Sequence, residues 1–511
     1  MKIEDLLVKP LWRRRLPPKQ QNKKQTGGMT NLPMQFDSGT FRLMSQSDFL
    51  DELNPSSHLI NCVNYRAMRT KYKYNPTTKK NEPNGLEDVE RIAVAVQQGI
   101  RRHKRTHTFG NEMWFGSESK DDTGDELVSL YRSHWNMTGM TDALSSWGDA
   151  LFGTGDAGLY LYREGDRINY KVFSFENGDV IAYKKDADGK DIFIRMFAYE
   201  GKKAVEIYGP VNVEFWLSGG KPEENGLPDP MDDKKTLEVS EDGYVLKARV
   251  AHGRTSCPVM YGRLNDVVWG IGQPTIEHIE SLLSDLGENN KYFAYQILFL
   301  SGGVMNLPPA KGMGKTIASK SPDGKAEILK PANASDTFKL DYEKSCDMLW
   351  ECTGTTVVDP KEMKAGENTG AFITNLYWRE IQWSKNMIAD LRPAFNTCVS
   401  IFSEYVGLIE GKTSEMKKLR MSFLLEPFVP KNITEEINNV CNAKNSKITS
   451  IKTASGEIPF NSPREEKRLA DELADERAQE DKRLAAKTAA TIANNKKVEG
   501  QEAGTDNKAK S

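Results

Sequence analysis

Two glycine-rich segments have the residue types that bind phosphate groups. Gly153–Gly158 matches the pattern G-x-G-x-x-G, which in a dinucleotide site stands between a strand and the N-terminus of a helix. Here a helix is predicted before the glycines and a strand after them, so we interpret the segment as a helix end that turns into a strand. Lys311–Thr316 ends like a phosphate-binding loop, but Pro309 stands where that loop needs its first glycine. The sequence therefore favours neither a dinucleotide cofactor nor ATP hydrolysis.

Two further patterns are weak candidates for metal binding. Asp186–Asp191 is similar to a calcium loop, but its glycine comes two positions early and Phe197 occupies the place of the bidentate glutamate, so a hairpin turn is the better interpretation. His103 and His107 are four residues apart in a basic run, yet no cysteine or third histidine accompanies them, which favours exposed basic surface. Motifs of serine hydrolases and zinc proteases are absent. We therefore expect a protein that is not an enzyme and has neither a metal nor a cofactor.

The composition is that of a somewhat polar globular protein. The chain has 511 residues, enough for roughly three domains at about 150 residues each, with 38% apolar and 28% charged residues. Its 70 basic and 72 acidic residues give a net charge of −2, so any contact with nucleic acid must be local. No apolar stretch approaches the roughly 18–20 residues of a membrane span, and the N-terminus lacks a signal peptide's apolar core. The six cysteines are scattered without a C-x-x-C pair, which indicates reduced thiols.

Both ends of the chain are rich in charge. Residues 1–25 carry eight basic and two acidic side chains, which predicts a flexible basic arm. Residues 462–511 carry eleven basic and eleven acidic side chains, and Leu469, Leu473 and Leu484 form only a thin apolar stripe. A helix over 464–490 would therefore need partners, and we expect about the last twenty residues to be disordered.

Between the tails, the hydrophobic pattern predicts helices followed by a β-rich region. Helices are expected over 86–108 and 125–152. Short β-branched and aromatic runs separated by turn residues predict strands at 159–162, 170–173, 180–183 and 192–196. From 145 to 245 the chain has 20 acidic and 12 basic residues, a net charge of −8. Such an acidic region is poorly suited to holding DNA.

A long helix, a basic insertion and a return helix follow. Pro274 starts a helix expected over 273–299, about 40 Å long at 1.5 Å per residue. Residues 300–340 are interrupted by glycine and proline and carry six lysines against three acidic residues, a net charge of +3. A return helix over 341–353 and a glycine-flanked loop over 354–369 come next.

The longest periodic signal lies at 370–407. Apolar residues from Ile373 to Val406 recur at steps of three, four or seven residues, which predicts a helix of about 40 residues. Pro393 lies inside this helix, where it has no N–H to donate and its ring clashes with the carbonyl four residues earlier. We therefore expect the helix to bend near residues 389–393.

The order of these elements resembles that of the portal (connector) proteins of tailed bacteriophages, in particular the siphophage type. Gly272–Leu283 is similar to the start of that family's first stem helix, Gly366–Phe372 to the start of its kinked helix, and Gly153–Tyr162 to its helix-to-strand turn. The likeness lies in the order and spacing of these segments and covers residues 60–460. The tails at 1–60 and 461–511 resemble nothing that we can name.

The resemblance implies an α+β portal fold, with a β-rich and helical wing, a helical stem, a small α/β clip insertion, a long kinked helix and a helical C-terminal crown. In chain order, the expected parts are a basic flexible arm (1–60), the first part of the wing (61–265), a stem helix (266–299), the clip (300–340), a second stem helix (341–353), a tunnel loop (354–370), the kinked helix with the rest of the wing (371–460), and a charged helical crown with a disordered tail (461–511).

The resemblance also implies a function. Portal proteins form a dodecameric ring at one capsid vertex, through which double-stranded DNA is packaged and ejected, and the ring docks the terminase and the head–tail adaptor. A protein of this kind belongs to the virion, is assembled in the cytoplasm of the bacterial host, contacts the major capsid or scaffolding protein, and has no membrane partner.

Two alternatives from other classes stay open. The first is an ATP-driven, terminase-like packaging motor, which predicts Mg²⁺-dependent ATP hydrolysis that Lys315→Ala abolishes. The second is a non-portal structural or adaptor protein of the virion, which predicts no large closed ring. The defective phosphate loop at Pro309 disfavours the motor.

Lysines are the candidate site residues of the portal interpretation. A conduit must let phosphates slide, so sparse lysines suit it better than a continuous basic surface, and Lys361 and Lys364 are the candidate DNA-facing residues of the tunnel loop. The candidate docking surface of the clip, for the motor or the adaptor, consists of Lys311, Lys315, Lys320 and Lys325. Ordinary solvated surface is the alternative for both groups.

Overall fold

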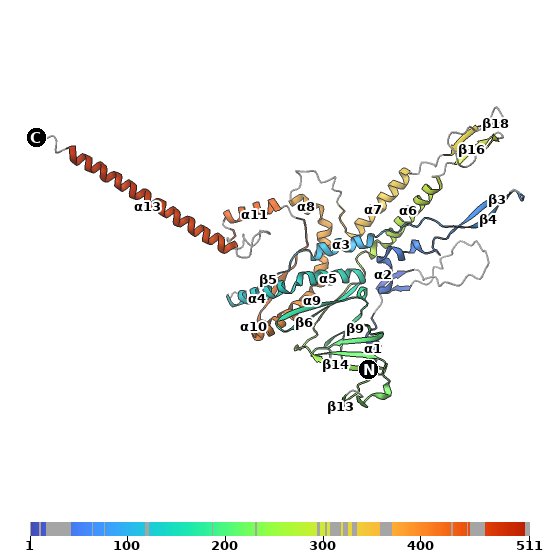
Figure 1. Cartoon of the computed structure of the whole chain (residues 1–511), viewed down its shortest axis with the longest axis horizontal. Coiled ribbons are helices and arrows are strands. Elements are labelled where there is room, and N and C mark those ends of the chain that lie inside the picture. Colours follow the sequence, from blue (N-terminus) through green and yellow to red (C-terminus); the bar gives the residue numbers. More distant parts are fainter. Residues whose placement is uncertain are drawn as a thin grey trace. The chain divides into compact units, whose positions relative to one another are not determined.

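The chain folds as a mixture of helices and antiparallel sheets (Figure 1). A computed structural model describes residues 2–9, 12–16, 42–63, 65–75, 77–117, 122–186, 188–229, 232–293, 297–301, 304–306, 318–319, 325–329, 335–357, 370–430, 433–446, 448–449 and 465–505. One compact unit comprises Met1–Val358 and Tyr377–Val429, and the other comprises Asp359–Leu376 and Pro430–Ser511. The predicted α+β class is confirmed.

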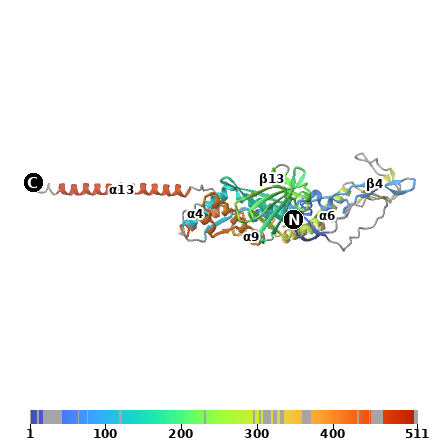
Figure 2. The same cartoon turned by 90° about the horizontal axis from the view of Figure 1, so that it is seen from below.

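Two antiparallel sheets form the β-rich part of the first unit. The order β15-β6-β7 makes a three-stranded sheet from Val259–Arg263, Asp156–Glu164 and Arg167–Phe173. The order β14-β11-β10-β9-β8 makes a five-stranded sheet from Tyr244–Ala251, Asn212–Ser218, Lys202–Tyr208, Asp191–Tyr199 and Val180–Lys185. Figure 2 shows these strands side by side. The four predicted strands are confirmed as β6, β7, β8 and β9.

The two short motifs in this region are structural, as the sequence predicts. Helix α5 (Met140–Thr154) ends at Gly155, whose positive φ of 83° and N–H bond to the Leu151 carbonyl close the helix before β6 begins. At the β8–β9 turn, the N–H of Asp186 donates to the Lys190 carbonyl and Gly189 has a φ of 77°. Both glycines adopt the positive φ that these turns require.

The helices before β6 are shorter than the sequence predicts. Helix α3 runs over Val96–Phe109, and the start of the helix expected at 86–108 is wrong because the N–H groups of residues 90, 92 and 94 bond to side chains of another helix. The helix expected at 125–152 is divided into α4 (Asp122–Thr138) and α5, because Gly139 between them has a left-handed φ of 71°.

Helix α9 (Trp378–Ile409) runs through the main core of the first unit. The ring of Phe395 contacts those of Phe109 and Trp147, and the ring of Phe402 contacts those of Tyr131 and Trp135. These aromatic side chains join α9 to α3, α4 and α5. Such contacts have the edge-to-face geometry that aromatic pairs prefer.

The single long helix expected at 370–407 is divided at one residue. Tyr377 separates α8 (Gly370–Leu376) from α9, with the non-helical angles φ −90° and ψ 12°. Pro393 is exposed inside α9, and the helix continues through it to Ile409. The bend expected at 389–393 therefore stays a prediction, whereas the helix boundary lies at Tyr377.

The predicted flexible arm at 1–60 is wrong for the described part of that segment. In helix α1 (Ile3–Leu6), Ile3 is fully buried against the five-stranded sheet. In helix α2 (Gln46–Leu53), Phe49 is fully buried in the main core. The many basic residues of this segment make its few apolar side chains easy to overlook. Removing each of these side chains from water stabilises the folded chain.

The helix pair and the basic insertion are present with shifted boundaries. Helix α6 spans Gln273–Phe293 and packs against α7 (Ser335–Thr353). The predicted end of the first helix at 299 is wrong, because β16 (Ile297–Ser301) pairs with β19 (Lys325–Leu329). The second helix begins at Ser335 and not at residue 341, in keeping with Ser-Asp as a helix start. The insertion between the helices therefore covers residues 294–334.

The remaining short elements of the first unit are paired strands and single helical turns. They are β1 (Trp12–Leu16) with β2 (Arg42–Met44), β3 (Arg69–Asn75) with β4 (Lys80–Glu87), β5 (Trp114–Ser117) with β20 (Met421–Leu424), β12 (Pro228–Asp229) with β13 (Asp232–Thr236), β17 (Val304–Asn306) with β18 (Ala318–Ser319), α10 (Thr413–Lys418), and the 3-10 helices η1 (Pro55–Ser57), η2 (Leu59–Asn61), η3 (Phe175–Asn177), η4 (Pro222–Glu224) and η5 (Gly270–Gly272).

The second unit is helical in its described residues. It contains α8, α11 (Ile433–Asn445) and the long α13 (Glu465–Thr505), drawn as one continuous helix in Figure 1. Helix α13 extends beyond the predicted end at 490 into the part expected to be disordered, because its alanine, glutamate, lysine and glutamine residues are strong helix formers. Among the described helices of the whole chain, none combines the length and apolarity that crossing a bilayer requires.

Candidate functional site

The structure places one of the predicted site lysines. Lys325 opens β19 opposite Ser301 of β16, and it is exposed. Lys361 and Lys364 of the loop lie outside the described residues, as do Lys311, Lys315 and Lys320 of the insertion. The described part of the site therefore consists of the elements that hold the loop and the helix pair.

A buried ion pair lies where the loop begins. The Lys104 ammonium of α3 is 3.0 Å from Oε1 of Glu380 in α9, and both side chains are fully buried. Lys104 also donates to the carbonyl of Gly354 at 2.7 Å, and the N–H of Thr356 donates to Glu380 Oε2 at 3.0 Å. Gly354 and Thr356 directly follow α7. The pair thus fastens the end of α7 to α3 and α9.

Burial makes this ion pair sensitive to the loss of either partner. Desolvation lowers the pKa of Lys104, and the charge of Glu380 opposes that shift. The ring of Trp383 lies 4.3 Å from the ammonium and adds a cation–π contact. If one partner is removed, the other remains as an uncompensated charge in the protein interior.

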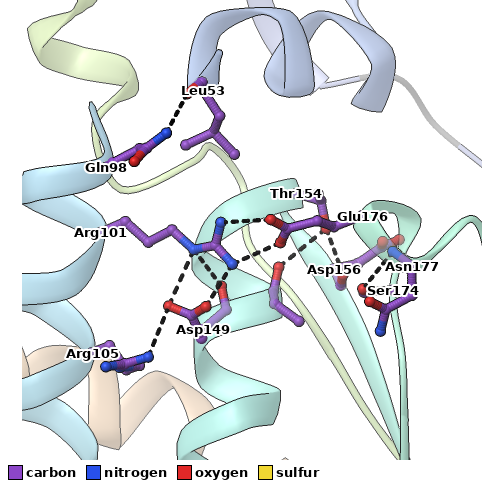
Figure 3. Close-up of polar contacts among 11 residues, drawn as sticks. Leu53, Gln98, Arg101, Arg105, Asp149, Thr154, Asp156, Ser174, Glu176 and Asn177 are labelled. Atoms are coloured by element: carbon purple, nitrogen blue, oxygen red, sulfur yellow. Dashed lines mark hydrogen bonds and ion pairs between the residues drawn. The ribbon is translucent and has the colours of Figure 1, made fainter. Parts of the chain in front are cut away.

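Two basic side chains of α3, Arg101 and His107, make contacts within the folded chain. Arg101 lies 2.6 Å from Asp149 of α5 and 2.7 Å from Glu176 of η3, and Figure 3 shows the guanidinium between the two carboxylates. His107 is buried, its Nδ1 lies 2.7 Å from the Phe428 carbonyl, and burial lowers its pKa. The expectation of exposed basic surface is therefore wrong for His107, although His103 is exposed. Within the described ranges, no group of three or more His, Cys, Asp or Glu side chains could hold a metal.

A second buried carboxylate fixes the N-terminal segment. Asp156, fully buried at the start of β6, accepts from Lys9 at 2.6 Å, from Gln46 at 2.6 Å and from Tyr261 at 3.1 Å. Figure 3 shows Asp156 next to Thr154, whose hydroxyl donates to the Asp156 carbonyl. Like the burial of Ile3 and Phe49, these hydrogen bonds attach the N-terminal segment to the rest of the first unit.

Helix α6 is held to the first unit by a buried histidine. Nε2 of His58 lies 2.7 Å from the Glu52 carbonyl, which can only accept, and Nδ1 lies 2.5 Å from a carboxylate oxygen of Glu280 in α6. This arrangement favours the imidazolium form of the ring, in which both nitrogens donate. Burial alone lowers the pKa of His58, but its bonds to Glu280 outweigh that effect and raise the pKa above its ordinary value.

An extended segment runs along α6 and bonds to it at regular intervals. The N–H groups of Glu90, Ile92 and Val94 donate to the side chains of Glu288, Ser284 and Glu280, respectively. Two extended residues advance about 6.6 Å and four helical residues about 6 Å, so the two spacings match. These directional bonds set the position of α6 along the segment.

Of the side chains in these contacts, His107 was singled out from the sequence, whereas Lys104, Glu380 and His58 were not. A usable signal exists for Lys104, because Ile100, Lys104 and His107 recur on the helix face that is buried in α3. A lysine on such a face predicts a buried acidic partner. The partner itself, Glu380, lies 276 residues further on, and no local pattern identifies it.

The comparisons with known proteins concern this whole arrangement. The sequence matches the family described as "Phage portal protein, SPP1 Gp6-like" over residues 63–483, which includes α3, α6, α7 and α9. The match covers about four-fifths of the chain, so this protein belongs to the phage portal protein family. The family resemblance seen in the sequence is confirmed.

Solved structures similar to the chain include particles of a gene transfer agent. "Virion of native gene transfer agent (GTA) particle" has a TM-score of 0.37 and 9% identity, covering 70% of this chain and 87% of that chain. "Neck of native GTA particle computed with C12 symmetry" has a TM-score of 0.34 and 9% identity, covering 71% and 89%. No curated protein matches the sequence.

The buried pair predicts a large effect of single substitutions. Lys104→Ala or Glu380→Ala should lower the free energy of unfolding by about 3–5 kcal/mol, because each leaves a buried unpaired charge. The double variant Lys104→Met with Glu380→Leu should recover most of that loss. The measurement is chemical denaturation followed by circular dichroism. Arg379→Ala, the control, removes an exposed neighbour and should cost under about 1 kcal/mol. Equal losses in Lys104→Ala and Arg379→Ala would contradict the prediction.

The His58–Glu280 contact predicts a stability change with pH. The folded-state pKa of His58 lies above the unfolded value of about 6.5, so the stabilisation is fully present below that pH. It is lost as the pH rises through the folded-state pKa. Denaturation midpoints across pH 5–9 should show this loss in the natural chain but not in His58→Gln. The control His278→Gln, at a half-exposed histidine, should keep the pH dependence of the natural chain. An unchanged profile in His58→Gln would refute the assignment.

Proposed function

We propose that this protein forms a dodecameric ring at one vertex of a phage capsid. The ring is a channel through which double-stranded DNA passes during packaging and ejection. It docks the terminase and the head–tail adaptor, contacts the major capsid or scaffolding protein, and assembles in the cytoplasm of the bacterial host. The protein acts by positioning DNA and partners and not by catalysis.

The observation that carries this proposal is the portal family match over residues 63–483. It includes the helix pair α6–α7, the insertion between them and the long helix α9. A match confined to the sheets would support only a shared domain. A match that spans every predicted part from wing to long helix supports the shared function of the family.

We propose new boundaries for these parts, taken from the described elements. The stem consists of α6 and α7, and the clip consists of residues 294–334 with the paired strands β16 and β19. The wing holds the two sheets with α3, α4, α5 and α9. The tunnel loop covers 354–370, and α13 belongs to the crown.

The contacts at the start of the loop support its role in the channel. The Lys104–Glu380 pair holds Gly354 and Thr356 at a set position relative to α3 and α9. A loop fastened in this way presents its later residues from a rigid base. Lys361 and Lys364 follow within a few residues, and they are the proposed weak contacts to DNA phosphates.

The first test is electron microscopy of the purified full chain, with light scattering to measure its mass. We expect rings with a central hole and a mass near twelve times 57.5 kDa. Particles without a closed ring would contradict the proposal, and so would Mg²⁺-dependent ATP hydrolysis abolished by Lys315→Ala. That second result would favour the packaging motor.

The second test concerns the loop. Lys361→Glu with Lys364→Glu should leave the ring intact and lower the amount of packaged DNA, because the loop would then repel phosphates. The control variant Lys417→Glu with Lys418→Glu makes the same charge change on the exposed surface of α10 and should package normally. Normal packaging by the loop variant would remove both lysines from the DNA-facing set.

A further inference from the structure

The β3–β4 hairpin has an uncovered apolar surface. Its two strands pair only with each other among the described residues, so both outer edges are free of strand partners there. Tyr72 is 62% exposed and Leu86 is 68% exposed. Because Tyr72 lies opposite Pro83 and Thr70 lies opposite Leu86, these side chains share one face of the hairpin. An isolated two-stranded hairpin is only marginally stable in water. We therefore expect another surface to pack against this hairpin.

The hairpin is also strongly basic. Lys71, Lys73, Lys79 and Lys80 are all exposed, and no ion pair joins any of them to another described residue. Glu82, the acidic residue across from Lys73, instead accepts hydrogen bonds from Asn75 at 2.8 Å and Thr78 at 2.6 Å. The four lysines thus outnumber the nearby carboxylate of Glu82, and none of them forms an ion pair with it.

The base of the hairpin is fixed to one side of α6. Arg66 pairs with Asp285 at 2.8 Å and Arg69 pairs with Glu288 at 3.0 Å. Figure 1 shows α6 lying between this hairpin and α7. The hairpin and α7 therefore occupy different sides of the same helix.

The outer face of α7 has the opposite character. Asp336, Glu343, Asp347 and Glu351 recur along one side of this helix, all exposed. Leu340 and Met348 lie among them and are 58% and 64% exposed. Three of these acids make exposed ion pairs, at 3.3 Å for Lys344–Asp347, 3.8 Å for Lys339–Glu343 and 3.6 Å for Arg379–Glu351, and such exposed pairs contribute little stability. Helix α7 thus presents acidic and apolar side chains on one side. In the hairpin, strand alternation places Lys71, Lys73 and Lys80 on the face opposite Tyr72, so that face is basic.

We propose that the β3–β4 hairpin of one copy of this chain docks on the outer face of α7 of a second copy. A closed ring needs two different, complementary surfaces on each subunit, because the contact between neighbours is heterologous. The basic face of the hairpin and the acidic side of α7 meet that need through opposite charge, on different sides of α6. The inference rests on the proposed ring and names the surfaces that close it.

DNA is the other partner that lysines and tyrosines could suggest. A phosphate backbone would match the four lysines, but it would leave the acidic and apolar face of α7 without a partner. The second copy accounts for both surfaces at once.

The test uses two charge-reversed full-length chains. The hairpin variant carries Lys71→Glu, Lys73→Glu and Lys80→Glu, and the helix variant carries Asp336→Lys, Glu343→Lys and Asp347→Lys. Each variant alone brings like charges together at every contact, so the concentration needed for half-maximal ring assembly should rise at least about tenfold. Mixed one to one, the two variants restore opposite charges at every contact of an alternating ring. Light scattering should therefore show rings in the mixture.

A matched control makes the same charge change elsewhere. Lys412→Glu, Lys417→Glu and Lys418→Glu reverse three exposed lysines at α10 and should assemble as the natural chain does. Thermal denaturation of each variant shows whether it folds. Because the mixture contains only those two chains, rings in it also show that both are folded.

Three outcomes would overturn the inference. Rings of normal mass from the hairpin variant alone would show that the hairpin is not in the subunit contact. Failure of the mixture to form rings would show that the two surfaces are not partners. Rings of the hairpin variant that form normally but retain less double-stranded DNA would assign the lysines to nucleic acid. If the natural chain forms no ring, the proposed function itself is wrong, which distinguishes the two failures.

Discussion

The buried ion pair between Lys104 and Glu380 is the constraint on which the rest of the arrangement depends. It joins α3 to α9 inside the aromatic core and takes in the backbone of Gly354 and Thr356. Two charges are removed from water there, and that cost is offset only while both partners and their hydrogen bonds are in place. The apolar core around Phe395 and Phe402 supplies the driving force, and the ion pair selects one alignment of the three segments.

Polar contacts set the position of α6 as well. Apolar packing is largely non-directional, whereas the bonds from residues 90, 92 and 94 to α6 and the contact of His58 with Glu280 require one register. These directional bonds therefore give α6 the same position in every copy of the chain.

Although the net charge of the chain is near zero, basic and acidic residues are concentrated in separate parts of it. The chain as a whole carries −2, yet the β3–β4 hairpin is basic, α7 is acidic, and residues 145–245 carry −8. Opposite charges on separate surfaces of one chain favour association between copies, while the balanced total avoids a general attraction to nucleic acid.

The sequence by itself determined the features that depend on local pattern: the strands β6 to β9, the helix end at Gly155, the helix pair around a basic insertion, and the order that identifies the portal family. Local pattern placed several boundaries wrongly, because residues 297–301 become strand only by pairing with 325–329. It also assigned the N-terminal segment to a flexible arm, because the surfaces that bury Ile3 and Phe49 lie far along the chain. Only the tertiary structure paired Lys104 with Glu380 and His58 with Glu280, because a buried charge is stabilised by a partner that is near in space and distant in sequence.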